Sequence, residues 1–218
     1  MKLLWINGSP NGKKGNSDIF IKKMQLGMKN QGDIKYVVQE DLAKLAKEML
    51  DYEMIIIVMP LYVFAMPGIV MRLFEEMTHD YTGIRIGFVV QYGFIEGKFS
   101  CYLDQYLKQY STSLNMDYMG SVYRGGSAGV YVMPEKMNKK LFKRLSLLGE
   151  SIEKNLQFDQ SIVDEFMQPY ELTKFAAKKY QLLTGIGMTN LFWNSCLKSN
   201  KAFDKRFDAP YGEAYDKK

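Results

Sequence analysis

Residues 2–17 read KLLWINGSPNGKKGNS, a short apolar run that passes into a polar segment with three glycines. The apolar run over residues 2–6 predicts a strand that is buried on both faces. Gly8, Gly12 and Gly15 then allow the backbone to bend sharply, so that several N–H groups can point at one place.

The polar segment ends where a helix is expected to begin. Asn16, Ser17 and Asp18 have the side chains that cap helix N-termini, and apolar residues recur at helical spacing over residues 19–28. A helix N-terminus offers free N–H donors and a partial positive charge. Strand, bend and helix start together predict a cradle for an anion.

Two common phosphate motifs do not fit this cradle. The pattern G-x-x-x-x-G-K-[ST] fails because Lys13 stands where its second glycine belongs, and G-x-G-x-x-G fails at Ser9-Pro10. The remaining pattern, G-S-P-x-x-x-x-x-N-S, resembles the phosphate loop of the flavodoxin-like NAD(P)H-dependent FMN reductases, including the flavin half of iron-sulfur flavoproteins. The resemblance implies that Ser9, Asn16 and Ser17 bind the FMN phosphate. A plain turn between strand and helix is the alternative.

A second motif lies fifty residues further on. Residues 59–68 read MPLYVFAMPG and resemble the family segment P-[VL]-Y-x-x-x-x-P, whose backbone lines the flavin ring. A proline at the strand end leaves the following amides unpaired in the sheet, and we expect them to meet the edge of the flavin. Tyr62 and Phe64 offer apolar faces to a flat ring, although ordinary loop packing would also use them. The flavin contacts implied here are Pro60, Leu61, Tyr62, Val63 and Phe64.

A third loop, Gln91-Tyr92-Gly93, follows the next expected strand, where the family closes on the other edge of the flavin. The chain also departs from the family. Asn11, which we include among the phosphate contacts, stands where relatives often have an arginine. Residues 39–41 enter a helix directly where many relatives carry a cysteine cluster, so no iron-sulfur centre is expected.

The chain alternates between short apolar runs and segments with helical spacing, which predicts an α/β fold with a doubly wound parallel sheet. The resemblance implies the flavodoxin-like strand order 2-1-3-4-5, in which ligands bind beyond the carboxyl ends of strands one and three. We expect strands over residues 2–6, 33–38, 54–59, 84–90 and 116–123, and later helices over 40–50, 68–78, 97–110 and 134–155.

We expect two parts: a flavodoxin-like FMN-binding domain over residues 1–155 and a helical, aromatic-rich extension over 156–218. The extension has enough apolar side chains to need a surface to pack against. That surface is its own domain, the flavin or another subunit, and we favour another subunit. These side chains are Phe166, Phe175, Tyr180, Leu191, Phe192, Trp193 and Phe203. Residues 54–71 carry no charge and are long enough to span a membrane, but Pro60, Pro67 and Gly68 argue against a spanning helix.

Charge and cysteine content narrow the class of protein. The net charge is +5, but the lysines are scattered in pairs, so we expect solvated faces and no nucleic-acid partner. Cys101 and Cys196 lack any zinc-binding spacing, which favours the reducing cytoplasm. The first residues are too short an apolar run for a signal sequence, and no membrane partner is expected. His79, the only histidine, lies in a helix-end turn where a structural role is favoured over catalysis.

No set of residues for nucleophilic or metal catalysis can be assembled from the sequence, which suits a flavin that carries its own reactivity. The resemblance implies an oxidoreductase with FMN as cofactor and NADPH or NADH as reductant. It would pass electrons to a quinone, a flavin or another small electrophilic acceptor, as a homodimer or higher homo-oligomer. An electron carrier of the flavodoxin kind and a flavin-free scaffold are the alternatives.

Overall fold

The computed structural model describes residues 1–185 and 190–208, without the side chains of Leu191 and Phe192. The chain divides into two compact units, Met1–Glu171 and Leu172–Lys218. The first unit contains the whole sheet and is described first.

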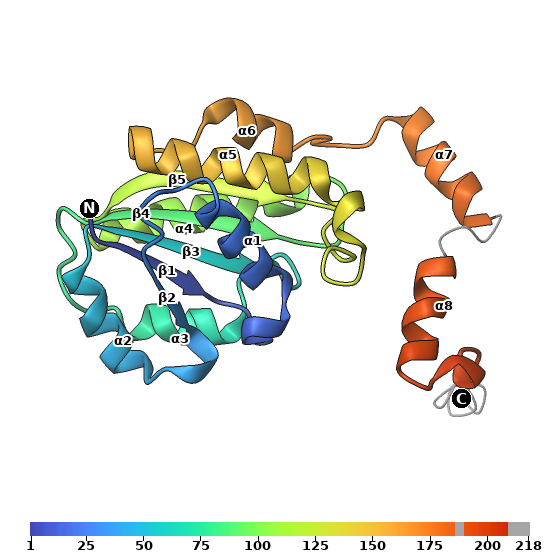
Figure 1. Ribbon diagram of the computed structural model, residues 1–218, viewed down its shortest axis with the longest axis horizontal. Helices are drawn as coiled ribbons and strands as arrows, with labels where there is room; N and C mark the ends of the chain where they lie inside the picture. The colour runs from blue at the N-terminus through green and yellow to red at the C-terminus, as the bar shows by residue number, and fades with distance from the viewer. Residues whose placement is uncertain (186–189, 209–218) are drawn as a thin grey trace, which may run out of the picture. The chain divides into compact units, whose positions relative to one another are not determined.

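The sheet has five parallel strands in the order β2-β1-β3-β4-β5, which confirms the predicted flavodoxin-like topology (Figure 1). All residues of β1 and β3 are buried, as expected for strands that are covered on both faces. The strands are β1 (Leu3–Asn7), β2 (Asp33–Tyr36), β3 (Met54–Pro60), β4 (Arg85–Gln91) and β5 (Asp117–Arg124).

Helices cover both faces of the sheet (Figure 1). One face is covered by α1 (Asn16–Gln25), α5 (Lys139–Asn155) and α6 (Gln160–Phe166), and the other by α2 (Leu42–Glu48), α3 (Gly68–Glu76) and α4 (Cys101–Ser113). Each face has its own apolar cluster, one around Trp5 and Phe20 and the other around Ile57 and Phe88. β1 and β3 therefore lie between two packed layers of helices, which fixes the position of their carboxyl ends.

Two glycines bring α1 and α5 together. A Cβ atom at Gly149 would lie 1.9 Å from the carbonyl oxygen of Met24, and one at Gly27 would lie 1.8 Å from that of Ser146. Neither position has room for a larger side chain, so this helix pair depends on glycine at both.

Some expected boundaries shift. The second strand ends at Tyr36 because Val37–Gln39 forms a short 3-10 turn, and the helix expected from residue 97 starts with the 3-10 turn Gly97–Ser100. The first unit also continues beyond residue 155. Phe158 and Phe166 are buried against the same face as α1, so α6 belongs to the compact unit that holds the sheet.

The second unit contains α7 (Lys174–Gly185), α8 (Asn190–Ser199) and the 3-10 turn Phe203–Lys205. Its helices keep large apolar side chains exposed, among them Phe175, Leu182 and Trp193. Residues 54–71 divide between β3, a loop and the first turn of α3, which is not a spanning segment. No helix in residues 1–185 or 190–208 combines the length and apolar character that crossing a membrane requires.

Candidate functional site

A pocket of about 300 Å³ lies at the carboxyl ends of β1, β3 and β4, the expected place for a ligand in this topology. Its volume is at the lower end of the range for small-molecule sites. Eleven of the thirteen lining residues belong to, or directly flank, the three predicted loops. The lining is Ser9, Asn11, Lys14, Gly15, Asn16, Pro60, Leu61, Tyr62, Gln91, Tyr92, Gly93, Ala128 and Tyr131.

The β1–α1 loop is shaped by Asn7, the fully buried last residue of β1. Its Oδ1 accepts the amide of Ser9 at 3.0 Å, and its Nδ2 donates to the carbonyl oxygen of Gly12 at 3.2 Å. Gly12 has a φ of +52°, a value that favours glycine. The side chain of Asn7 thus holds both Ser9 and Gly12 and fixes the shape of the loop between them.

The expected capping of α1 is wrong. The helix begins at Asn16, its N-cap is Gly15, and no side chain accepts a bond from its first turn. Asn16 donates to the carbonyl oxygen of Ser127, and Asp18 accepts from Tyr36 at 2.7 Å and pairs with Lys22 at 2.6 Å. Because the amides of the first turn have no side-chain cap, they stay available to an external anion.

Two buried polar atoms at this helix start have no partner among the described residues: Oγ of Ser17 and Oδ1 of Asn16. Ser17 is fully buried, and a buried hydroxyl without a partner is costly. The hydroxyl of Ser9 accepts the Asn11 amide at 3.3 Å, and its hydrogen stays free to donate. Two hydroxyls and an uncapped helix start are the donors that a phosphate group requires, so these residues fit the phosphate of FMN.

Two charged groups lie at the cradle: the exposed cation of Lys14 and the carboxylate of Asp18, which forms an ion pair with Lys22. Lys14 is exposed and lines the pocket. The Asp18 carboxylate is buried beside Lys22 and the Tyr36 hydroxyl. Burial and, to a lesser extent, the hydrogen bond to Asp18 raise the pKa of Tyr36 to about 12. Tyr36 therefore stays a neutral donor to Asp18 at physiological pH, and the carboxylate is balanced within the protein.

The loop after β3 forms a tight two-residue turn in which Tyr62 and Ala65 exchange backbone hydrogen bonds of 2.8 and 2.9 Å. Val63 and Phe64 both have positive φ, 48° and 63°, which is unfavourable for a β-branched and an aromatic residue. The Leu61 amide donates to the carbonyl oxygen of Gln91. The amides expected to be free at Leu61 and Tyr62 are therefore occupied, and those of Val63 and Phe64 make no hydrogen bond to any described residue.

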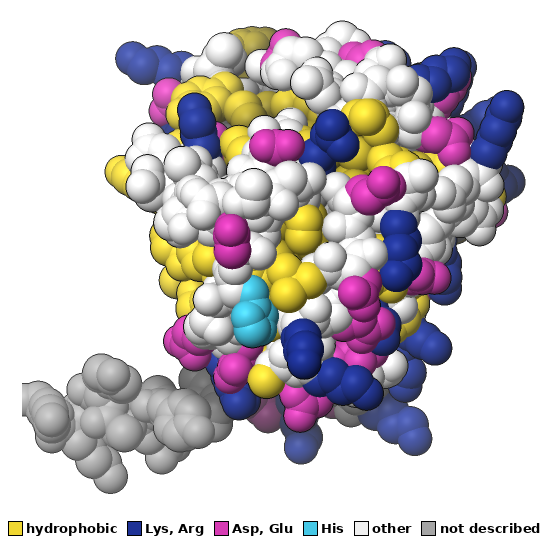
Figure 2. Space-filling model, turned by 90° about the vertical axis from the view of Figure 1, so that its left-hand side faces the viewer, with side chains coloured by type: hydrophobic (Ala, Val, Ile, Leu, Met, Phe, Trp, Pro, Cys, Tyr) yellow, Lys and Arg dark blue, Asp and Glu magenta, His cyan; other side chains and the backbone are white. Residues whose placement is uncertain are grey.

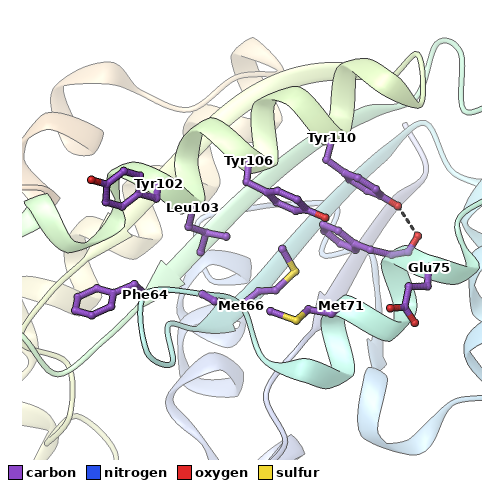
Figure 3. Close-up of a pocket in the computed structure, with 10 residues that line it drawn as sticks. Phe64, Met66, Met71, Glu75, Tyr102, Leu103, Tyr106 and Tyr110 are labelled. Carbon is purple, nitrogen blue, oxygen red and sulfur yellow. Dashed lines mark hydrogen bonds between the residues drawn. The ribbon is translucent and has the colours of Figure 1, made fainter.

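The turn also separates its side chains. Tyr62 lines the pocket, whereas Val63 is 90% exposed. Phe64 packs against Phe99, with ring centroids 5.5 Å apart, and lines a second, apolar pocket of about 480 Å³ between α3 and α4. Figure 3 shows this pocket, with Tyr102, Tyr106 and Tyr110 along α4 and Met66 and Met71 opposite them. Phe64 thus lies away from the residues that line the first pocket.

The β4 and β5 loops close the pocket from the other side. Gln91 and Tyr92 are buried, burial raises the pKa of the Tyr92 hydroxyl, and Gly93 lies opposite Ala128. Arg124 is half-buried over the ring of Phe166 at 5.7 Å, and burial lowers the pKa of its guanidinium. Arg124 is therefore not a solvated surface side chain.

The opposite end of the first unit has a different character. Figure 2 shows that face, with acidic and basic side chains intermixed and His79 among them. The His79 ring contacts Tyr81 with centroids 6.5 Å apart. Within the part of the chain that the structure describes, no three His, Cys, Asp or Glu residues are grouped as metal ligands would be.

Sequence reasoning assigned no site role to five residues: Asn7, Lys14, Ser127, Ala128 and Tyr131. Asn7 was recoverable, because a polar residue ends an otherwise apolar strand just before the glycine-rich bend. Lys14 looked like one of several scattered lysine pairs. Ser127 and Tyr131 join the site through contacts across more than a hundred residues, which no local pattern signals.

No family model and no curated protein matches the chain. Several solved structures share its fold. An NADPH-quinone reductase from P. pentosaceus is 17% identical, with a TM-score of 0.55 over 71% of this chain and 99% of its own. General stress protein 14 from Treponema denticola, in complex with FMN, is 14% identical, with a TM-score of 0.55 over 72% and 100%.

An FMN-dependent NADH-azoreductase from Bacillus anthracis, also in complex with FMN, is 15% identical, with a TM-score of 0.53 over 70% of this chain and 99% of its own. At these identities the likeness shows the fold, which is the flavodoxin-like fold that the sequence motifs predicted. The neighbours named are oxidoreductases and FMN-bound proteins of the kind that the two motifs resemble.

Proposed function

We propose that the chain is an FMN-dependent NAD(P)H oxidoreductase that holds its flavin in the pocket at the carboxyl ends of β1, β3 and β4. The observation that carries this proposal is the buried Ser17 hydroxyl without a partner at the uncapped start of α1. A ligand with an anionic group would satisfy both features, and they lie at the topological switch point of the sheet.

The fold neighbours support the cofactor and the reductant. Two of the three structures described above contain FMN, and the other is a reductase named for NADPH. When bound, FMN would accept a hydride from NADPH or NADH and pass two electrons to a quinone, a flavin or another small electrophilic acceptor.

The chain's own residues would bind FMN and orient its ring. Ser9 and the first amides of α1 would hold the phosphate from the pocket wall, together with the unpartnered hydroxyl of the buried Ser17, and Asn11 and Lys14 would lie at its exposed side. Tyr62 and the Pro60–Leu61 backbone would lie along the ring on one side and Gln91, Tyr92 and Gly93 on the other. The unbonded amide of Val63, the residue after the pocket-lining Tyr62, would supply a hydrogen-bond donor at the edge of the ring, where preorganised donors stabilise developing negative charge.

Anaerobic stopped-flow mixing tests the reaction. The FMN-loaded chain should lose its visible flavin absorbance rapidly on mixing with NADPH or NADH, and a quinone should restore it. A chain that binds FMN and stays oxidised with both nicotinamides would instead be an electron carrier of the flavodoxin kind. A chain that stays colourless after addition of FMN would contradict both functions.

We also propose that the protein works as a homo-oligomer in the cytoplasm. The α3–α4 pocket presents Tyr102 at 75% exposure and Tyr106 at 50%, and contiguous exposed apolar surface of this kind marks interaction sites. Light scattering on the purified chain should give a multiple of the 25.2 kDa chain mass, and Tyr106→Glu should lower it. Lys108→Glu, an exposed position on the same helix, is the control.

A further inference from the structure

We infer, resting on the proposed function, that Asn16 is a positioning residue whose side chain ties the start of α1 to residues 125–133 and does not bind the phosphate. The resemblance assigned Asn16 to the phosphate together with Ser17. Its hydrogen bonds in the structure indicate a different role.

The donor capacity of the Asn16 amide is already used. Its Nδ2 donates to the carbonyl oxygen of Ser127 at 2.7 Å and lies 3.5 Å from Oε1 of Gln91. Two oxygen neighbours fix which amide atom is nitrogen. The atom left over is Oδ1, an acceptor, and an acceptor cannot bond to a phosphate oxygen that carries no hydrogen.

The bond to Ser127 holds a segment that forms one wall of the pocket. The same carbonyl oxygen accepts the amide of Val130 at 3.1 Å, and the Val130 carbonyl accepts Nδ2 of Asn138, just before α5, at 3.1 Å. Ala128 lies between these bonds and lines the pocket, as does Tyr131, which follows them. Fixing Ser127 therefore fixes the position of the wall.

The segment is also attached to the β4–α4 loop, but through backbone atoms. The Ser127 amide donates to the carbonyl oxygen of Tyr92 at 2.8 Å, and the Gly126 amide donates to that of Phe94 at 2.7 Å. These bonds survive side-chain substitution. Removing the Asn16 amide thus frees the segment on the α1 side alone, which makes its contribution measurable without unfolding the loop.

A comparison of two flavins separates positioning from phosphate binding. Asn16→Ala should weaken FMN and riboflavin, which lacks the phosphate, by the same factor of about 5- to 20-fold, the usual effect of losing one buried hydrogen bond. Ser9→Ala, a proposed phosphate donor, should weaken FMN about tenfold and change riboflavin binding less than about twofold. Circular dichroism should confirm that both variants are folded.

Hydrogen exchange on the ligand-free protein provides a readout that needs no flavin. Asn16→Ala and Asn16→Asp should both speed amide exchange over residues 125–133, at Val130 by about tenfold, because both lose the donor while aspartate keeps the size and the oxygen. Asn30→Ala removes an amide bond to the Met1 carbonyl at the other end of the sheet and should leave this exchange unchanged.

The outcomes are distinct. If Asn16→Ala weakens FMN and leaves riboflavin unchanged, Asn16 binds the phosphate directly and the inference is wrong while the proposed function stands. Unchanged exchange over residues 125–133 in both Asn16 variants also overturns it. If the unmodified chain binds neither flavin, the proposed function fails, and the exchange result still decides whether Asn16 holds this segment.

Discussion

Ser17→Ala should have opposite effects on the free protein and on its complex with FMN. Ser17 is fully buried, and its Oγ has no hydrogen-bond partner among the described residues. Burying an unsatisfied hydroxyl costs about 1–3 kcal/mol, and alanine also has a slightly better helix propensity than serine. The ligand-free variant should therefore be more stable than the parent, by about 1–2 kcal/mol.

Ser111→Ala is the matched control. Ser111 is equally buried in a helix, but its Oγ donates to the carbonyl oxygen of Leu107 at 2.7 Å. Its removal should leave the free energy of unfolding unchanged or lower it by about 1 kcal/mol, since a satisfied bond is lost. Neither Ser111 nor Leu107 lines the proposed flavin pocket, so FMN binding should not change.

Urea denaturation with and without FMN measures both effects. In the presence of FMN, Ser17→Ala should lose about 1.5–3 kcal/mol of ligand stabilisation, the contribution of a hydrogen bond to a charged group. A ligand-free Ser17→Ala that is destabilised as much as Ser111→Ala would refute the reasoning. It would mean that the Ser17 hydroxyl already has a partner in the free protein, such as an ordered water molecule.

Three further substitutions test the fold of the first unit. Gly149→Ala places a Cβ atom 1.9 Å from the Met24 carbonyl oxygen and should cost about 3 kcal/mol or more of stability in urea denaturation. Burial raises the pKa of Tyr81 from 10.0 to about 12, so the folded state keeps its proton longer and the free energy of unfolding should fall between pH 10 and 12. Tyr81→Phe should flatten that fall by about 2–3 kcal/mol, as measured by unfolding at each pH. Val63→Asn should raise the melting temperature, with a gain of about 1 kcal/mol, because asparagine tolerates a φ of 48° and the valine side chain is 90% exposed.

The sequence predicts the sheet well because its signal is local. β3 is an unbroken apolar run, β1 is apolar up to Asn7, and each is followed by a loop whose motif resembles a family segment. That resemblance implied the strand order and, with it, the edge of the sheet that holds the site. The same reasoning gathers Ser9, Pro60 and Gln91 correctly, since parallel strands bring their carboxyl ends together.

The individual roles at the site were less predictable. Asn16 is suited to capping, but its amide finds the Ser127 carbonyl 111 residues away, a bond that only the folded chain makes possible. The loop after Pro60 was expected to leave its first amides free, yet a turn between Tyr62 and Ala65 uses one of them. That turn needs positive φ at Val63, which residue preferences argue against. Tertiary contacts decided each of these outcomes against the local signal.

The most direct measurement of the central claim is a crystal structure of the chain with FMN. The account predicts density for the phosphate within hydrogen-bonding distance of the Ser9 and Ser17 hydroxyls and the first amides of α1, with the ring between the Pro60–Tyr62 segment and Gln91–Gly93. Density for the flavin in the apolar pocket between α3 and α4, or an empty cradle at saturating FMN, would contradict it.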